Sequence, residues 1–335
     1  MAIGSDHARK YRKTLDQIFD LQRNRATIAP ARAKRGPEPG LKFLPVNRSS
    51  RGMPGWSPGV VDQVRQEQTM EILEWILLML AVGAAAGFIA GLAGIGGGML
   101  LVPALYFIYK SMSLSDDGVM HLAIGTSLCI MVATSISSIT SHQKQGDIIW
   151  PIFWKVLPGL VVGVVAGAIL AHFLPSRTLA LIFGVILAIV SLTMITGLVT
   201  SAGRKDLPSN GIMASIGVVI GFKSGLLGVG GGALSVPFLT WCGLPVAKIS
   251  GTSSTFTFPV AVAGTIAFMI SGIIGKVDIQ WTTGYVYWPA VVTVAVGTVI
   301  LAPLGTRVSH HIPRRGMRIG FGVFLLLLGI RMIMV

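Results

Sequence analysis

Apolar runs of about 20 residues recur along this chain from residue 71 onward, and they constrain its fold more than any other feature. A helix needs roughly 20 apolar residues to cross about 30 Å of hydrocarbon. The runs lie at about 72–90, 121–142, 151–174, 178–199, 250–274, 283–305 and 316–335, with two glycine-interrupted segments beginning near 77 and 211. We therefore predict an all-α polytopic membrane protein with eight spans, or more segments if the interrupted ones fold back.

The composition and the tryptophan positions support this class. The mean hydropathy is +0.73 and only 12% of the residues are charged, too few to cover a water-facing surface. Six of the seven tryptophans fall near span ends, where an indole ring can stay in the membrane interface. These residues are Trp75, Trp150, Trp154, Trp241, Trp281 and Trp288.

One fifteen-residue segment occurs twice. Residues 91–105 read GLAGIGGGMLLVPAL and residues 225–239 read GLLGVGGGALSVPFL, with ten identical positions at a constant offset of 134. Each copy places a triple glycine and a following proline inside an apolar segment. Similarity at one fixed offset predicts an internal repeat.

The similarity continues through three further pairs of segments in the same order. Gly-Thr-Ser occurs at 125–127 and 251–253, GDIIW is followed by a counterpart VDIQW, and PSRTLALIFGV has a counterpart PRRGMRIGFGV. We predict two homologous repeats of about four transmembrane helices, 71–199 and 211–335, joined by a linker at 200–210. Each repeat opens with a glycine-broken helix or hairpin, and neither would enclose a site alone.

The first 70 residues differ from the rest. They hold 13 Lys and Arg against 6 Asp and Glu, with no long apolar run, which predicts a disordered basic tail. The positive-inside rule assigns such a tail to the cytoplasmic side of the cell (inner) membrane, where anionic lipid could hold it. No zinc spacing or aromatic-interleaved basic patch indicates nucleic acid as a partner.

The sequence leaves two topologies open. Eight crossings give two parallel halves, whereas re-entrant glycine hairpins give each half an odd number of crossings and make the halves inverted. Both arrangements leave the arginine-rich loop at 307–318 outside when the tail is inside, so charge does not choose between them.

The triple glycines predict a break in each helix, because each glycine costs about 1 kcal/mol of helix stability relative to alanine. An isolated glycine in a membrane helix more often serves close packing. Unwound backbone at membrane depth is tolerated only where it is buried within the protein or lines a water-filled cavity. If a helix restarts there, the positive end of its dipole favours the binding of an anion. Paired interrupted segments also indicate the central site of a secondary transporter. The predicted substrate-binding glycines are Gly96, Gly97, Gly98, Gly230, Gly231 and Gly232.

Side chains near the glycines add to the predicted site. Lys223 lies two residues before the second motif, where the first half has Ile89. Five hydroxyls could donate to anion oxygens or bond back to a carbonyl one turn earlier: Thr126, Ser127, Thr252, Ser253 and Ser254. No Asp or Glu after Glu74 falls inside a predicted span, which argues against a cation as substrate.

The paired GxxGxGGGxxxxP segments, each followed by a Gly-Thr-Ser segment, resemble the sulfite exporter TauE/SafE family of membrane permeases. The resemblance covers about residues 77–335 and leaves the basic tail outside. It implies a permease for small sulfur-containing anions such as sulfite, sulfoacetate or related organosulfonates. The motif does not choose among these substrates.

We therefore predict a secondary transporter, most simply an exporter, that needs no cofactor and no metal. A passive anion channel or a permease for a non-sulfur organic anion remains the alternative. An enzyme is not predicted, because the three histidines of the membrane region have no carboxylate or cysteine partner at metal-ligand spacing. These are His121, His142 and His172. The oligomeric state is not fixed by the sequence.

Overall fold

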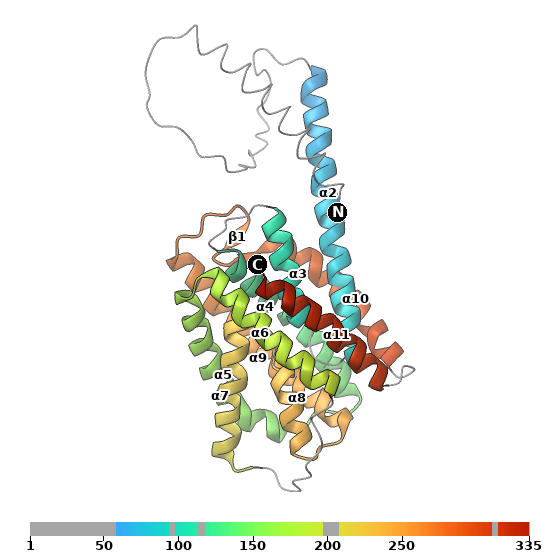
Figure 1. The fold of residues 1–335 in the computed structure, drawn as a ribbon, viewed down its shortest axis with the longest axis vertical. Coiled ribbons are helices and arrows are strands. Elements are labelled where there is room, and N and C mark those ends of the chain that lie inside the picture. Colours follow the sequence, from blue (N-terminus) through green and yellow to red (C-terminus); the bar gives the residue numbers. More distant parts are fainter. Residues whose placement is uncertain (1–57, 94–97, 113–117, 197–207, 310–313, 335) are drawn as a thin grey trace. The chain divides into compact units, whose positions relative to one another are not determined.

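The computed structural model describes residues 58–93, 98–112, 118–196, 208–309 and 314–334, all within one unit of the chain, Arg48–Val335. Helices make up nearly all of this part (Figure 1). They are α2 (Pro58–Ala93), α3 (Gly98–Ser111), α4 (Val119–Lys144), α5 (Trp150–Phe173), α6 (Ser176–Thr196), α7 (Asn210–Leu227), α8 (Gly232–Trp241), α9 (Val246–Ile274), α10 (Trp288–Ser309) and α11 (Arg314–Ile333). Strands β1 (Thr282–Thr283) and β2 (Val286–Tyr287) form a short antiparallel hairpin before α10.

Five of the described helices, α4, α5, α6, α7 and α9, are long and apolar enough to cross a membrane. Shorter apolar stretches lie in α2, α3, α10 and α11. Large apolar side chains such as Val162, Ile189 and Val292 are exposed on the outside of the bundle, as lipid-facing positions require. The prediction of an all-α polytopic membrane protein is confirmed.

Helices α5 and α7 pack along two rows of glycines spaced four residues apart. The rows are Gly159, Gly163 and Gly167 on α5 and Gly217, Gly221 and Gly225 on α7. A methyl group on any of these glycines would collide with the backbone of the other helix, so the rows permit the close approach that small residues give membrane helices. Because Gly159 faces Ala214 and Gly167 faces Phe222, the two helices run parallel.

Helices α2 and α10 form a second parallel pair. Gly83 of α2 faces Val294 of α10, and Gly87 faces Thr298 one turn further along both helices. In each pair, the glycine-interrupted helix of one predicted repeat packs on a helix of the other repeat. The duplication itself stays a prediction from the sequence. The structure adds that α2 and α7, the corresponding helices of the two predicted repeats, both pack in parallel on a helix of the other repeat.

The first glycine-interrupted segment folds as a hairpin. Near the end of α3, Tyr109 packs edge-on against Tyr287, with ring centroids 5.7 Å apart. Tyr287 immediately precedes α10, and α10 begins at the same end of the bundle as the apolar part of α2. Helix α3 therefore returns to the end from which α2 enters, and its 14 residues, about 21 Å at 1.5 Å per residue, are too few to cross the bilayer.

The second segment folds as a hairpin from the opposite end. Helix α7 begins beside the start of α5, and α8, of only 10 residues, leads into the start of α9. The start of α9 also lies beside the start of α5, because the backbone N–H of Ile149 donates to Oγ1 of Thr252 at 3.1 Å. Helix α4 extends between the two ends of the bundle, because it begins beside Tyr285 and ends next to the start of α5.

The structure therefore adopts the inverted arrangement, one of the two that the sequence left open. Outside the two hairpins, the described helices α4, α5, α6 and α9 are long and apolar enough to cross a membrane, and α10 and α11 contain shorter apolar stretches. The described parts of α2–α3 and α7–α8 fold back, which is the re-entrant alternative that the sequence left open beside eight crossings. Helices α4 and α9 pack against each other between the hairpins, and α6 packs antiparallel on α11.

Helix α2 begins at Pro58, so its first residues fall within the predicted tail. The remainder of the predicted tail, residues 1–57, lies outside the described residues, as does most of the predicted linker at 200–210.

Candidate functional site

The second triple glycine separates α7 from α8. Helix α7 ends at Leu227, and Gly228 then takes a left-handed conformation with φ of +67°, which glycine adopts without the steric cost of a Cβ atom. Gly231 precedes the first residue of α8, Gly232. The predicted break is confirmed here.

The first triple glycine lies between α2 and α3. Helix α2 ends at Ala93 and α3 begins at Gly98, while Gly96 and Gly97 lie outside the described residues. Pro103 and Pro237 each lie inside the short helix that follows the break.

The two glycine segments meet inside the bundle. A methyl group on Gly98 would lie 3.1 Å from the backbone nitrogen of Gly230 and 2.7 Å from the sulfur of Met131. One on Gly230 would lie 2.9 Å from Cγ2 of Thr257. Gly98 and Gly230 to Gly232 are all buried. The starts of α3 and α8, which carry the positive ends of two helix dipoles, are thus brought close together.

The Gly-Thr-Ser segments brace the bundle between its two halves. Oγ1 of Thr126 accepts a hydrogen bond of 3.1 Å from the backbone N–H of Tyr287, just before α10. Thr252 accepts the matching bond from Ile149, just before α5. These oxygens hold the starts of two long helices, and each hydroxyl keeps its own proton to donate elsewhere.

The three serines of the predicted site have different partners. Ser127 donates to the carbonyl oxygen of Gly228 in the second glycine break at 3.3 Å. Ser253 and Ser235 of α8 share a buried hydrogen bond of 2.6 Å. Ser254 donates to the carbonyl of Gly251 in its own helix, which is the local bonding pattern rather than a site contact. Ser127 and Ser253 therefore connect α4 and α9 to the second hairpin.

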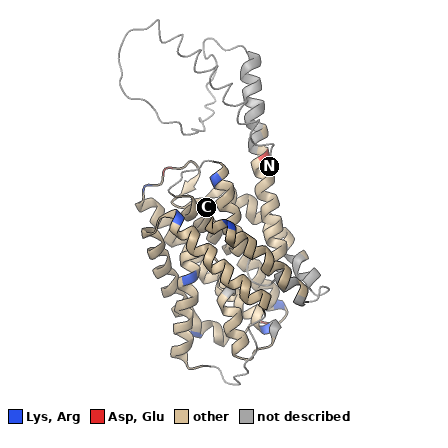
Figure 2. Ribbon diagram, in the orientation of Figure 1, with Lys and Arg blue, Asp and Glu red and all other residues tan. Residues whose placement is uncertain are grey.

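Lys223 is buried in α7, one and a half turns before the second break, and is 8% exposed. Among the described residues, its Nζ atom has no hydrogen-bond partner. Lys155 of α5 and Arg331 of α11, two other basic residues of the apolar helices, are exposed, as expected of side chains that extend toward an interface. Figure 2 shows how few charged residues the described helices carry.

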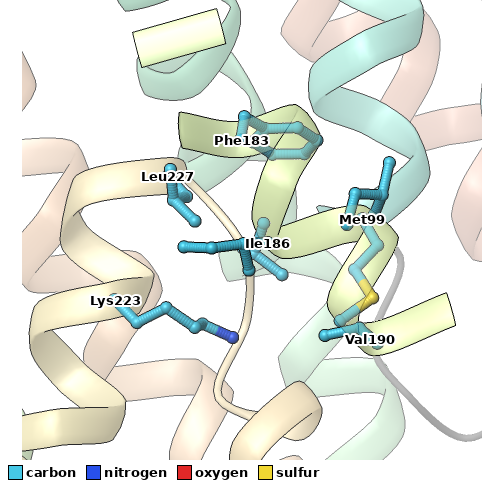
Figure 3. A pocket seen from close by; sticks show the side chains of 8 residues that line it. Met99, Phe183, Ile186, Val190, Lys223 and Leu227 are labelled. Carbon is cyan, nitrogen blue, oxygen red and sulfur yellow. The ribbon is translucent and has the colours of Figure 1, made fainter. Parts of the chain in front are cut away.

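Lys223 points toward a small pocket between α6, α7 and the start of α3 (Figure 3). The pocket walls are apolar, and they include Val229 from the glycine break itself. The other side chains are Met99, Phe183, Ile186, Leu187, Val190 and Leu227. The sequence singled out Lys223 but not the α6 wall, because nothing in the local pattern of α6 indicates which neighbour its apolar face meets.

Acidic and metal-ligating groups contribute nothing to this region. No Asp or Glu occurs in any helix from α3 to α11. Within the described part of the chain, no three His, Cys, Asp or Glu side chains gather where they could hold a metal ion. His121 instead bonds the carbonyl oxygen of Ala171 through Nε2 at 2.8 Å, which joins α4 to the end of α5.

Comparison with known proteins agrees with the arrangement of glycines and helices. The family of the sulfite exporter TauE/SafE matches residues 79–332. The chain belongs to this family. A probable membrane transporter protein of Haemophilus influenzae is 30% identical over 263 residues, which are 77% of this chain and 98% of that protein. Another, of Methanocaldococcus jannaschii, is 28% identical over 267 residues, 79% of this chain and 97% of the relative.

No solved structure matches the chain. The TauE/SafE match includes both glycine motifs, both Gly-Thr-Ser segments and Lys223, and it excludes the basic tail. The chain is therefore a multi-pass membrane protein of a transporter family.

Proposed function

We propose that this TauE/SafE protein is a secondary transporter that exports small sulfur-containing anions such as sulfite, sulfoacetate or another organosulfonate. One observation carries the proposal: two helix starts converge at the glycine breaks, and the side-chain nitrogen of Lys223, which has no hydrogen-bond partner among the described residues, lies on the pocket beside them. Oriented N–H groups, helix dipoles and a cation all favour negative charge. The lack of Asp and Glu on α3 to α11 supports an anion over a cation.

The membrane potential supports export as the direction of transport and could itself supply the driving force. A negative cell interior favours the exit of an anion by about 2.3 kcal/mol per charge per 100 mV, so export needs no nucleotide. We assign the protein to the cell (inner) membrane, with its basic tail on the cytoplasmic side and near anionic lipid. The match to a transporter family supports transport rather than catalysis.

A carrier fits the glycine contacts better than a passive channel. The backbones of the two hairpins touch at Gly98 and Gly230, so a continuous path would require them to move apart. A carrier that alternates between two conformations makes such a movement in each cycle.

The test is a flux measurement on purified protein in liposomes. Labelled sulfite or sulfoacetate should exchange, and unlabelled anion on the far side should accelerate the exchange. Flux without acceleration would identify a channel. Flux of a carboxylate such as acetate in preference to every sulfur anion would assign the protein to another organic anion. No flux of any anion would refute the proposal.

A further inference from the structure

The end of the bundle from which α2 enters carries basic side chains on neighbouring helices. Lys110 lies in the last turn of α3 and Arg331 in the last turn of α11. The guanidinium carbon of Arg331 lies 5.1 Å from the centre of the Phe107 ring of α3, so the two helices end side by side (Figure 1). The Nζ atom of Lys110 lies 6.0 Å from the ring centre of Tyr106. Two cations therefore lie at one corner of the bundle, each beside an aromatic ring that attracts it.

Arg177 of α6 belongs to the same corner. Helix α6 packs on the last turns of α11, because a methyl group on Gly184 would lie 2.7 Å from Cγ1 of Ile333. Arg177 comes about two turns before Gly184 and so lies on the same side of α6. Since α6 runs antiparallel to α11, this position lies near the end of α11. We call Lys110, Arg177 and Arg331 together the basic corner.

The basic corner has no acidic neighbours in the part of the chain that the structure describes. Its three side chains are all exposed, and α3, α6 and α11 carry no Asp or Glu. Among the described residues, the one contact between a basic and an acidic side chain joins His142 to Asp147, beyond the far end of α4. No described carboxylate therefore neutralises the three cations.

Hydrocarbon side chains continue from the basic corner along the outside of the bundle. Val185 of α6 lies about two turns inward from Arg177, and Leu327 of α11 lies about one turn inward from Arg331. Both side chains are exposed. A soluble anion would contact only the cations, whereas a phospholipid would also place its acyl chains on this hydrocarbon. The combination of charge and hydrocarbon fits a phospholipid with an anionic head group.

We infer that the basic corner binds the phosphodiester of an anionic phospholipid, whose acyl chains lie along α6 and α11. In the orientation proposed above, this end of the bundle faces the cytoplasm, and the cytoplasmic leaflet carries a negative surface potential from its anionic lipids. Lys110 belongs to the re-entrant helix α3, so a bound lipid joins the first hairpin to α6 and α11. The site is separate from the N-terminal tail and does not depend on which anion the protein carries.

A purely structural role for these residues makes a different prediction. Lys110 and Arg331 each lie in the last turn of a helix, where a positive charge stabilises the helix dipole. In that role, their removal would lower the melting temperature equally in every lipid and would leave lipid affinity unchanged. Two lipids with the same acyl chains and different head groups therefore distinguish the two roles.

The experiment titrates dioleoyl phosphatidylglycerol or dioleoyl phosphatidylcholine into the purified full-length protein in detergent and follows binding by native mass spectrometry. At its tightest site, phosphatidylglycerol should bind roughly tenfold more tightly than phosphatidylcholine. Lys110→Gln and Arg331→Gln should each weaken that binding about threefold, and the triple variant with Arg177→Gln about tenfold or more. Lys155→Gln, which changes an exposed lysine near the start of α5 at the opposite end, is the matched control and should leave the affinity unchanged.

A photoreactive phosphatidylglycerol tests the site in the wild-type protein, so the result does not depend on the folding of any variant. Its label should appear at the end of α3, the start of α6 or the end of α11. Labelling confined to residues 1–57 or to the opposite end of the bundle would overturn the inference. So would equal binding of the two lipids, or unchanged phosphatidylglycerol affinity in a folded triple variant. Displacement of the lipid by soluble glycerol phosphate at equal concentration would make the corner a site for soluble anions instead.

Discussion

The two glycine-broken hairpins, α2–α3 and α7–α8, share the glycines and the proline of their motifs but differ at the position of Lys223. Each enters from its own end of the bundle, and each packs its first helix in parallel on a helix of the other half. At the position where α7 has Lys223, α2 has Ile89. The shared residues thus build the breaks, and the difference places a buried lysine beside the second break alone among the described residues.

Glycine substitutions in the two packing rows should have the largest effect. Gly221→Leu in α7 and Gly87→Leu in α2 should both prevent folding or cost about 3 kcal/mol or more, because the added side chain meets the backbone of α5 or α10. Gly211→Leu in α7 is the control, since open space surrounds Gly211. Thermal unfolding in detergent measures the effect. A stable Gly221→Leu protein beside an unstable Gly87→Leu protein would show that the two hairpins are anchored differently.

Removing the charge tests the asymmetry directly. Lys223→Ile gives the second hairpin the residue type of the first, and we expect anion flux in liposomes to fall at least tenfold. The melting temperature should stay equal or rise, because an unpaired buried charge has been removed. Lys223→Arg should keep part of the flux, since the charge survives with a different shape. Unchanged flux in Lys223→Ile would make the hairpins functionally equivalent.

The bracing threonines should matter equally in the two halves. Thr126→Val and Thr252→Val each leave one half-buried backbone N–H, of Tyr287 or Ile149, without its acceptor. The expected loss of stability is about 1 kcal/mol for each, measured by thermal or denaturant unfolding. Ser254→Ala is the matched control and should cost less, because its bond lies within one helix. A large loss from only one threonine would contradict the matched bracing.

The N-terminal segment should have the smallest effect. Deletion of residues 1–57 stops just before α2 and removes nothing from either glycine hairpin. Anion affinity should therefore stay unchanged, as titration of the purified protein would show. A large loss of affinity in a normally expressed deletion variant would make this segment part of the transport mechanism.

The sequence by itself determined the class of the protein, the position of the second break and the membership in a transporter family. Apolar runs of membrane length leave few alternatives to helices, since backbone polar groups must be satisfied within the segment. A triple glycine lowers helix stability wherever it occurs. Both signals are local, so they can be interpreted without knowing which helices are neighbours.

Only the tertiary structure decided which way the hairpins face and what the polar residues contact. The inverted arrangement follows from contacts such as Ile149 with Thr252 and Tyr109 with Tyr287, each between residues more than 100 positions apart. The sequence shows that residue 252 is a threonine, but it does not show whether the hydroxyl contacts an anion or a backbone N–H. Lys223 likewise lacks a partner only because the α6 face opposite it is apolar. Contacts of this kind depend on how distant helices pack, which no local pattern of residues specifies.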